Sequence, residues 1–221
     1  MLHYQLTADL ETHICCSMKD AALFSLALNK VAAITAGYPL RVSAETLDVG
    51  DTAFLQLKNV NPDTGIEWDS VDRVELPSER RPRWLSPHDV IFAARGARNF
   101  AYSLIDAPER CVCAPHFFVL NIKNPENLHP EFLAWQINQR PAQDYFRKTA
   151  VGSQAVITIR RPAMEELPVV IPPMEEQLTI VEFARAARRE HAALTRLIEN
   201  NSQLSSAIAF GLHQRLKGTH S

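Results

Sequence analysis

Apolar residues follow two different spacings along this chain, and the change between them divides it into two parts. Before Pro172 they occur in short runs or alternate with polar residues, between turn-forming residues, which is typical of strands. After Pro173 they recur every three to four residues, which is typical of a helix. The pattern predicts an α+β fold, with a strand-rich body at 21–173 and one long helix at 174–217.

Several segments of the body are predicted to be strands, and turn residues separate them. The segment NPDTG at 61–65 is a predicted turn, and Pro115 indicates that the strand around it is bent or lies at a sheet edge. The predicted strands are 30–37, 52–60, 90–94, 98–106 and 111–122, with a further short strand after a glycine-led loop in 152–159.

Two helices are predicted inside the body. HPEFLAWQIN places Pro130 at a first helical position, and a second helix follows Pro141 at about 142–148. Residues 1–20 have no firm period and are read as an N-terminal arm, either loose or with a short helix ending near Met18.

The C-terminal helix is predicted from the prolines and acidic residues at its start and from the lack of proline after them. Pro172 and Pro173 cannot continue a strand ladder, and Glu175 and Glu176 favour the positive end of a helix. No proline follows up to Leu216, which leaves about 40 helical residues, or roughly 60 Å at the α-helical rise.

An apolar seam with polar breaks runs along this helix at alternating spacings of four and three, and Leu197 and Leu204 widen it. A single helix cannot bury such a seam, so we expect the helix to pair in a coiled coil with a second copy, with Asn201 fixing the register. The alternative is that the helix folds back on its own body. The seam is Ile180, Ala184, Ala187, His191, Leu194, Ile198, Asn201, Ser205, Ile208 and Leu212.

Composition is that of an ordinary globular protein. The chain has 221 residues, of which 46% are hydrophobic and 22% are charged. No apolar run is long enough to span a membrane, and the N-terminal residues lack the basic start and apolar core of a secretory signal. The four cysteines, at 15, 16, 111 and 113, do not form a disulfide pattern. We therefore expect a cytoplasmic protein.

The order of several segments resembles the DNA-specificity (S) subunits of type I restriction–modification systems. The resemblance covers roughly 28–216, and its most specific parts are the Pro-Pro-x-x-Glu-Gln entry into the long helix and the Gly-Ser-Gln loop before it. The segments are KVAAITAG, AFLQLKNV, LSPHDVIFAARG, FFVLNI, LHPEFLAWQIN, VGSQAVITI and LPVVIPPMEEQLTIVEF.

The resemblance implies a target-recognition domain that reads DNA bases, followed by a spacer helix. The usual subunit holds two such units, whereas this chain holds one, so it looks like a half-length form in which two copies supply both halves of a bipartite site. The implied partners are double-stranded DNA, a methyltransferase (M) subunit that uses S-adenosylmethionine and a restriction/translocase (R) subunit. No cofactor or metal is expected on the chain itself.

Local basic clusters within 80–98 and 140–161 support DNA binding despite a formal net charge of −2. Arginine reads guanine, and asparagine or glutamine reads adenine. For any single arginine, a solvated surface residue or an ion pair is the plainer interpretation. The candidate DNA-binding residues are Arg80, Arg81, Arg83, Arg95, Arg98, Asn99, Tyr102, Arg147, Lys148, Ser153 and Gln154. Gln177 is expected to cap the helix or to pack, and the alternative is contact with a partner.

Few residues of the sequence support an enzymatic function. Cys111, Cys113 and His116 lack the spacing of a zinc site and lack an orienting third group for a nucleophile. No dinucleotide-binding or Walker loop is present. We therefore expect a non-catalytic specificity subunit. The alternatives are a dimeric DNA- or protein-binding module of another defence or regulatory system, and a small Cys/His enzyme.

Overall fold

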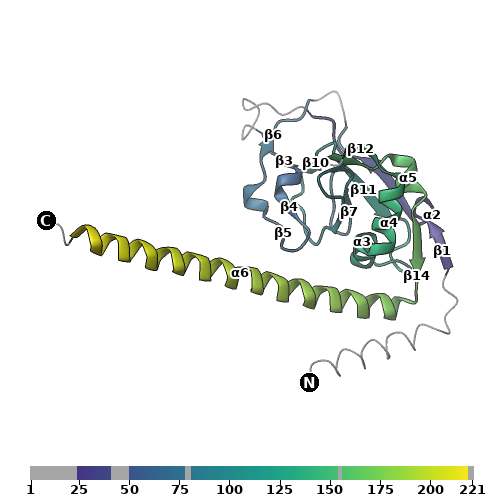
Figure 1. Cartoon of the computed structure of the whole chain (residues 1–221). Coiled ribbons are helices and arrows are strands. Elements are labelled where there is room, and N and C mark those ends of the chain that lie inside the picture. The colour runs from purple at the N-terminus through teal and green to yellow at the C-terminus, as the bar shows by residue number, and fades with distance from the viewer. Residues whose placement is uncertain (1–23, 41–49, 78–80, 154–155, 219–221) are drawn as a thin grey trace, which may run out of the picture.

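The computed structural model consists of a compact α+β body and one long helix, α6 (Met174–Gly218), that runs along the body and projects past it (Figure 1). The structure describes residues 24–40, 50–77, 81–153 and 156–218. The predicted arm at 1–20 therefore lies outside the described residues. The body and the long helix agree with the fold class expected from the sequence.

The centre of the body is a four-stranded antiparallel sheet in the order β2–β11–β7–β9. Its strands are β2 (Ala32–Ala36), β11 (Phe117–Ile122), β7 (Val90–Ala93) and β9 (Ala101–Ser103). The predicted strands at 90–94 and 98–106 form a hairpin, in which Val90 pairs with Ser103 and Phe92 with Ala101. All four residues of β7 are buried, as its uninterrupted apolar run requires.

A second, smaller sheet covers the other side of β7. It has the order β10–β3–β6, with β10 (Cys111–Cys113) parallel to β3 (Thr52–Leu55) and β6 (Arg73–Val74) antiparallel to it. The 3₁₀ turn η2 (Leu57–Asn59) then leads into the hairpin of β4 (Val60–Asn61) and β5 (Gly65–Ile66), and η3 (Trp68–Ser70) follows. Gly65 has φ of 94°, which explains the glycine at the end of the predicted turn.

The prediction of one strand over 111–122 is wrong. Pro115 separates β10 from β11, and the two strands belong to different sheets. Proline supplies no backbone donor, so the ladder stops there and the chain turns from one sheet into the other. The strand predicted at 52–60 is likewise shorter than expected, because it ends at Leu55 and passes into η2.

Helices cover the outer face of the central sheet. The predicted helices are confirmed as α3 (Pro130–Asn138) and α4 (Arg140–Thr149), each with proline in its first turn. Amide side chains join α3 to two strands: Asn138 exchanges two 2.8 Å hydrogen bonds with the backbone of Ala101, and Gln136 bonds both backbone groups of Val170.

Two short sheets complete the body. The strand β1 (Phe24–Ala27), which precedes the single-turn helix α2 (Leu28–Val31), pairs with β14 (Pro168–Ile171). The sheet β12–β13–β8 consists of β12 (Val151–Ser153), β13 (Val156–Thr158) and β8 (Arg95–Gly96), and α5 (Arg161–Glu165) follows it. The predicted glycine-led loop at Gly152 is therefore a strand.

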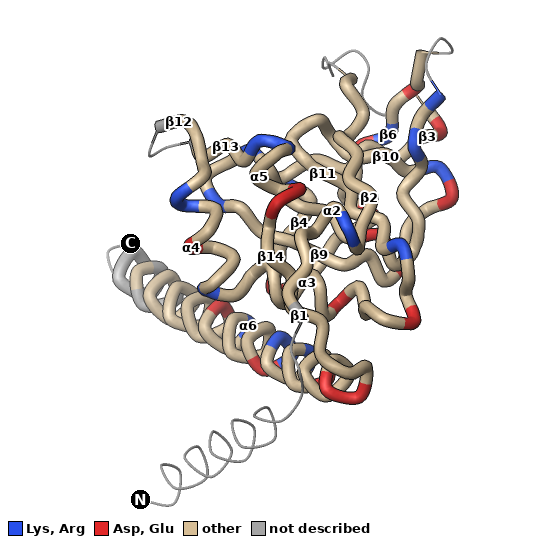
Figure 2. Tube along the Cα trace, turned by 90° about the vertical axis from the view of Figure 1, so that its right-hand side faces the viewer, with Lys and Arg blue, Asp and Glu red and all other residues tan. Residues whose placement is uncertain are grey.

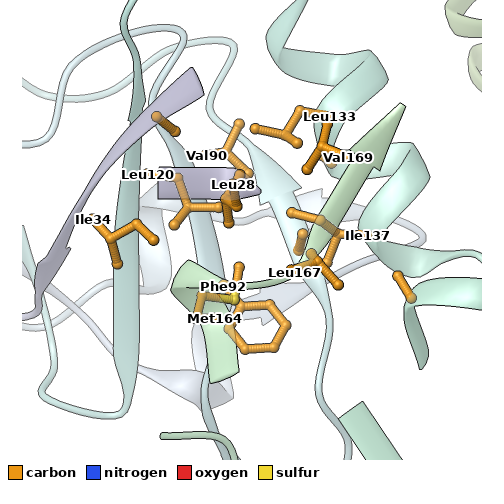
Figure 3. Packing of buried hydrophobic residues seen from close by; sticks show 14 of the residues in the cluster. Leu28, Ile34, Val90, Phe92, Leu120, Leu133, Ile137, Met164, Leu167 and Val169 are labelled. Carbon is orange, nitrogen blue, oxygen red and sulfur yellow. The ribbon is translucent and has the colours of Figure 1, made fainter. Parts of the chain in front are cut away.

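The two sides of the central sheet bury separate apolar clusters. On the helical side, Leu28, Phe92, Leu120, Leu133, Ile137 and Met164 pack together, as Figure 3 shows. On the other side, Phe54, Leu55, Ile91, Cys111, Cys113 and Phe117 form the second cluster. Alternate residues of β7 enter opposite clusters, Phe92 the first and Ile91 the second, so this strand holds both halves of the body together.

In the part of the chain that the structure describes, no helix is both long and apolar enough to cross a membrane.

Candidate nucleic-acid interface

The structure joins two basic segments that lie far apart in the sequence. In the β12–β13–β8 sheet, Arg95 pairs with Thr158 and Gly96 with Ile157, and the backbone N–H of Ile159 donates to the carbonyl of Ala94 at 2.8 Å. Parts of the predicted clusters at 80–98 and 140–161 therefore lie at one edge of the body. We call Arg95, Arg98, Lys148 and Arg160 the basic edge.

All four side chains of the basic edge are exposed, and within the described residues none of them forms an ion pair. Neighbouring cations are partly neutralised: Arg147 pairs with Asp144, and Arg161 pairs with Glu165 at 2.7 Å. Figure 2 shows Lys and Arg positions around β12, β13 and α4. The arrangement places unpaired guanidinium and ammonium groups where phosphates or base edges can approach.

Other predicted DNA-binding residues are engaged inside the body. Both terminal guanidinium nitrogens of Arg83 donate to Asp89 at 3.0 Å, and the Asp89 side chain is only 1% exposed. Asn99 is 7% exposed and donates to the carbonyl of Ala93 at 2.8 Å. These contacts give both residues a role in holding their own loops, which sequence reasoning did not separate from DNA contact.

The remaining predicted residues are distributed over the body. Arg81 lies with Arg83, Tyr38 and Cys113 around a small pocket whose lining includes no residue of the basic edge. The backbone of Ser153 pairs with Val156 in the β12–β13 hairpin. Arg80 and Gln154 lie outside the described residues. The predicted cluster at 80–98 is therefore split in space.

Tyr102 lies in a cleft between the body and α6. The turn residues Asp63 and Thr64 and the side chain of Ile105 face Arg188, Arg189 and Arg196 across a cleft of about 590 Å³. Tyr102 lies against Arg188 and Gly65 in an adjoining pocket. Burial raises the pKa of the Tyr102 hydroxyl, and the positive charge of Arg188 partly offsets this effect.

The polar attachment of α6 to the body was not predicted. Glu131, in the first turn of α3, has a side chain that is only 10% exposed. It accepts hydrogen bonds from both Nε and Nη2 of Arg185, the former at 3.1 Å, and from Arg188 at 3.1 Å. Burial alone raises the pKa of Glu131, but the bonds and charges of the two arginines outweigh it and lower the pKa below its usual value. We call these three residues the latch.

Gln177 makes the second attachment, one turn into α6. It is 0% exposed, its Nε2 donates to the carbonyls of Asn127 and Pro172 at 2.8 Å each, and its Oε1 accepts from the N–H of His129 at 2.9 Å. The expectation that Gln177 packs is confirmed, whereas its side chain caps no N–H group of its own helix. The sequence signal for both attachments was a charged or amide residue at a position facing the core.

The apolar seam predicted on α6 is divided between two environments. Ile180 and Ala184 are half-buried near the body, while Ala187, His191, Leu194, Ile198, Asn201, Ser205 and Ile208 are exposed. The side chain of Leu212 is not among those that the structure describes. Seven large apolar residues of α6 are between 52% and 70% exposed, namely Phe210 and a group of six: Phe183, Leu194, Leu197, Ile198, Leu204 and Ile208. We call these six the outer strip.

The cysteines that suggested an enzyme are unsuited to nucleophilic chemistry. Cys111 and Cys113 are buried in β10, and burial raises the pKa of each thiol to about 12. At neutral pH they are therefore protonated, and only the thiolate is a strong nucleophile. His116 is exposed on the turn beyond them.

Comparison with known proteins identifies the fold. No protein-family model and no curated protein sequence matches the chain. Among solved structures, the S subunit of a type I restriction–modification system from M. genitalium is similar, with a TM-score of 0.57 and 14% identity, over 84% of this chain and 44% of that one.

Two further structures agree. The HsdS subunit from Thermoanaerobacter tengcongensis has a TM-score of 0.55 and 16% identity, over 80% of this chain and 40% of that one. A structure that concerns the complex assembly and conformational transition of the type I R-M system has a TM-score of 0.54 and 18% identity, over 88% of this chain and 48% of that one. The chain thus spans less than half the length of each of these three structures. It shares its fold with the specificity subunits of type I restriction–modification systems.

Proposed function

We propose that this chain is a non-catalytic DNA-specificity subunit of a type I restriction–modification system that reads one half of a bipartite site. The observation that carries the proposal is the shared fold, in which a body of the same architecture is followed by a long helix. The basic edge supplies exposed cations on a rigid sheet, where arginine can contact phosphates or guanine edges. A second body, on a second copy, would read the other half-site.

The outer strip supports pairing of two copies. Exposed leucine and isoleucine at helical spacing are costly in water, and a matching helix removes them from it. We call α6 the rod. Two rods related by a two-fold axis would hold two bodies at a fixed separation and in inverted orientation. The expected DNA site therefore has two inverted halves separated by a spacer of fixed length.

The methyltransferase subunit is expected on the same helix and the adjoining flank of the body. There Trp135, Tyr145, Pro168 and Pro172 line an apolar groove of about 440 Å³, which ends at Ile180 on the helix. Ile180 lies half-buried on α6, so the groove reaches the helix and offers such a partner an apolar surface that includes both.

The test is to express the chain with a methyltransferase encoded beside it and to map the methylated bases in the host DNA. Methylation confined to one bipartite inverted sequence, and lost when the chain is omitted, is the expected result. Copurification without any sequence-dependent methylation would contradict the assignment. DNA selection with the purified chain alone separates this function from that of a regulator, because a regulator would select a site without needing a methyltransferase.

A further inference from the structure

The latch is where the direction of α6 relative to the body is decided. Gln177 holds the helix at its first turn, Val181 is buried one turn later, and the latch holds it at Arg185 and Arg188. The helix has two polar attachments on one side, separated by two to three turns. Two separated attachments fix both the position and the angle of a rod, whereas one fixes only its position.

Glu131 is the residue of the latch on which the angle depends. Its carboxylate is the shared acceptor for Arg185 and Arg188, whereas Arg185 has an additional acceptor in Glu182 at 3.1 Å. The Glu131 side chain is only 10% exposed, so its charge would be left largely desolvated without compensation if the two arginines moved away, and this favours one geometry of the contact. The attachment therefore depends on a single buried carboxylate.

The length of the rod amplifies a small change at this point. From Arg188 to the end of α6 is about 30 residues, or about 45 Å at the α-helical rise. A rotation of about 10° at the latch would move the far end by about 8 Å, which equals roughly two base steps along DNA. Half-site spacing is therefore sensitive to a rotation that hardly disturbs the core of the body.

We propose that Glu131 is a positioning residue that sets the spacing between half-sites, by fixing the angle between the rod and the reading body through Arg185 and Arg188. This inference rests on the proposed function, since spacing has meaning only if two bodies read one site. It assigns Arg185 and Arg188 to the protein's own geometry, although both lie in an arginine-rich cleft that resembles a DNA contact.

The experiment compares the full-length protein with the Glu131→Gln variant, which keeps the shape of the side chain and removes its charge. Glu165→Gln is the matched control, because it removes the exposed Arg161–Glu165 pair on the body without touching α6. Binding is measured on the selected site with the natural spacer and with spacers two base pairs shorter or longer. Glu131→Gln should reduce the preference for the natural spacer by about tenfold or more, and Glu165→Gln should leave it unchanged.

A second readout tests the angle without DNA. Spin labels at Ser70→Cys on the body and Ala207→Cys on α6, in a Cys15→Ser, Cys16→Ser background and diluted with unlabelled protein, report the distance between body and rod. A broader distance distribution in Glu131→Gln is expected. The same narrow distribution and the same spacer preference as in the unmodified latch would overturn the inference.

The two readouts distinguish this failure from failure of the proposed function. If the unmodified protein shows no spacer preference but Glu131→Gln still broadens the distances, the function as a bipartite reader fails while the angular role of Glu131 stands. Should Glu131→Gln not fold, Arg188→Gln removes only one of the two partners and must give a smaller effect in the same direction. Where Glu131→Gln does fold, the double variant Glu131→Gln, Arg185→Gln must lower the spacer preference by no more than the sum of the two single effects, because both substitutions remove the same contact.

Discussion

The inner and outer halves of α6 have similar helical patterns but opposite surroundings. The inner segment, 174–192, places Gln177, Val181 and the latch arginines against its own body. The outer segment, 193–210, carries five of the six residues of the outer strip, and its far part projects past the body (Figure 1). One half of the helix is held by polar contacts of defined geometry, and the other half offers aliphatic side chains to water.

This difference shows that one helix can carry out two separate tasks. The polar attachments of the inner half have strict directional requirements, so they fix an angle. The apolar contacts available to the outer half are non-directional and scale with area, so they provide affinity for a second helix. The inner half therefore determines geometry within one chain, and the outer half is expected to determine association between chains.

The largest effect is expected from breaking the outer half. Leu197→Asp together with Leu204→Asp should weaken self-association by about a hundredfold or more, because each paired helix would bury two carboxylates in place of two leucines. Sedimentation or light scattering at micromolar concentration measures it. Gln203→Asp, on the opposite side of α6, is the control and should leave the dimer intact. A protein that is monomeric before any substitution would remove the pairing claim.

Breaking the inner half should instead cost stability. Gln177→Ala leaves the carbonyls of Asn127 and Pro172 and the N–H of His129 without their partner, which we expect to lower the free energy of unfolding by about 2–3 kcal/mol. Denaturant titration measures the loss. Gln203→Ala, an exposed glutamine of the same helix, should change stability by less than about 0.5 kcal/mol. Equal effects of the two variants would mean that the inner attachment contributes nothing special.

Reading of bases should be separable from both halves of the helix. Arg95→Ala or Arg98→Ala should reduce discrimination between the selected site and other DNA by about 1–3 kcal/mol if the arginine contacts a base. Association and unfolding should stay unchanged. Binding titrations on matched and mismatched DNA distinguish the cases: uniform weakening on all DNA would assign the residue to phosphate, and unchanged binding would leave it a surface residue. Arg161→Ala, already paired with Glu165, is the control.

The smallest effect is expected on the stability of the protein at acid pH. The folded state lowers the pKa of Glu131, so the latch contributes stability above the usual glutamate pKa, and this contribution is lost as pH falls through the lowered value. The stability of the unmodified protein should therefore fall more steeply below about pH 4 than that of Glu131→Gln. Unfolding measured by tryptophan fluorescence between neutral and acid pH tests this. Parallel curves for the two proteins would show that Glu131 does not titrate with folding.

Much of the architecture could be predicted from the sequence because its signals are local. Pro130 at a helix start, the turn at 61–65 and the apolar run of β7 each depend on a few neighbouring residues, and the structure confirms them. The division of 111–122 into two sheets was missed, because Pro115 indicates an interruption but not where the next strand goes. A local signal can end an element, but it does not choose the partner strand.

The candidate site shows the same limit. Arginine-rich segments at 80–98 and 140–161 were visible in the sequence. The sequence did not show which of their arginines stay exposed and which pair inside the body. Arg83 turns inward to Asp89, while Arg95 joins Thr158 at the basic edge. The roles of Arg185 and Arg188 depend on Glu131, which precedes Arg185 by 54 residues. An arginine looks the same in sequence whether its partner is a carboxylate of its own chain or a phosphate.

The sequence by itself determined that a strand-rich body precedes one unbroken helix with an apolar seam, since proline placement and the spacing of apolar residues depend only on backbone geometry. Only the tertiary structure decided which cations remain exposed, which part of the helix lies on the body and which carboxylate holds it there. Those properties depend on contacts between residues distant along the chain, and burial and desolvation exist only once such contacts have formed.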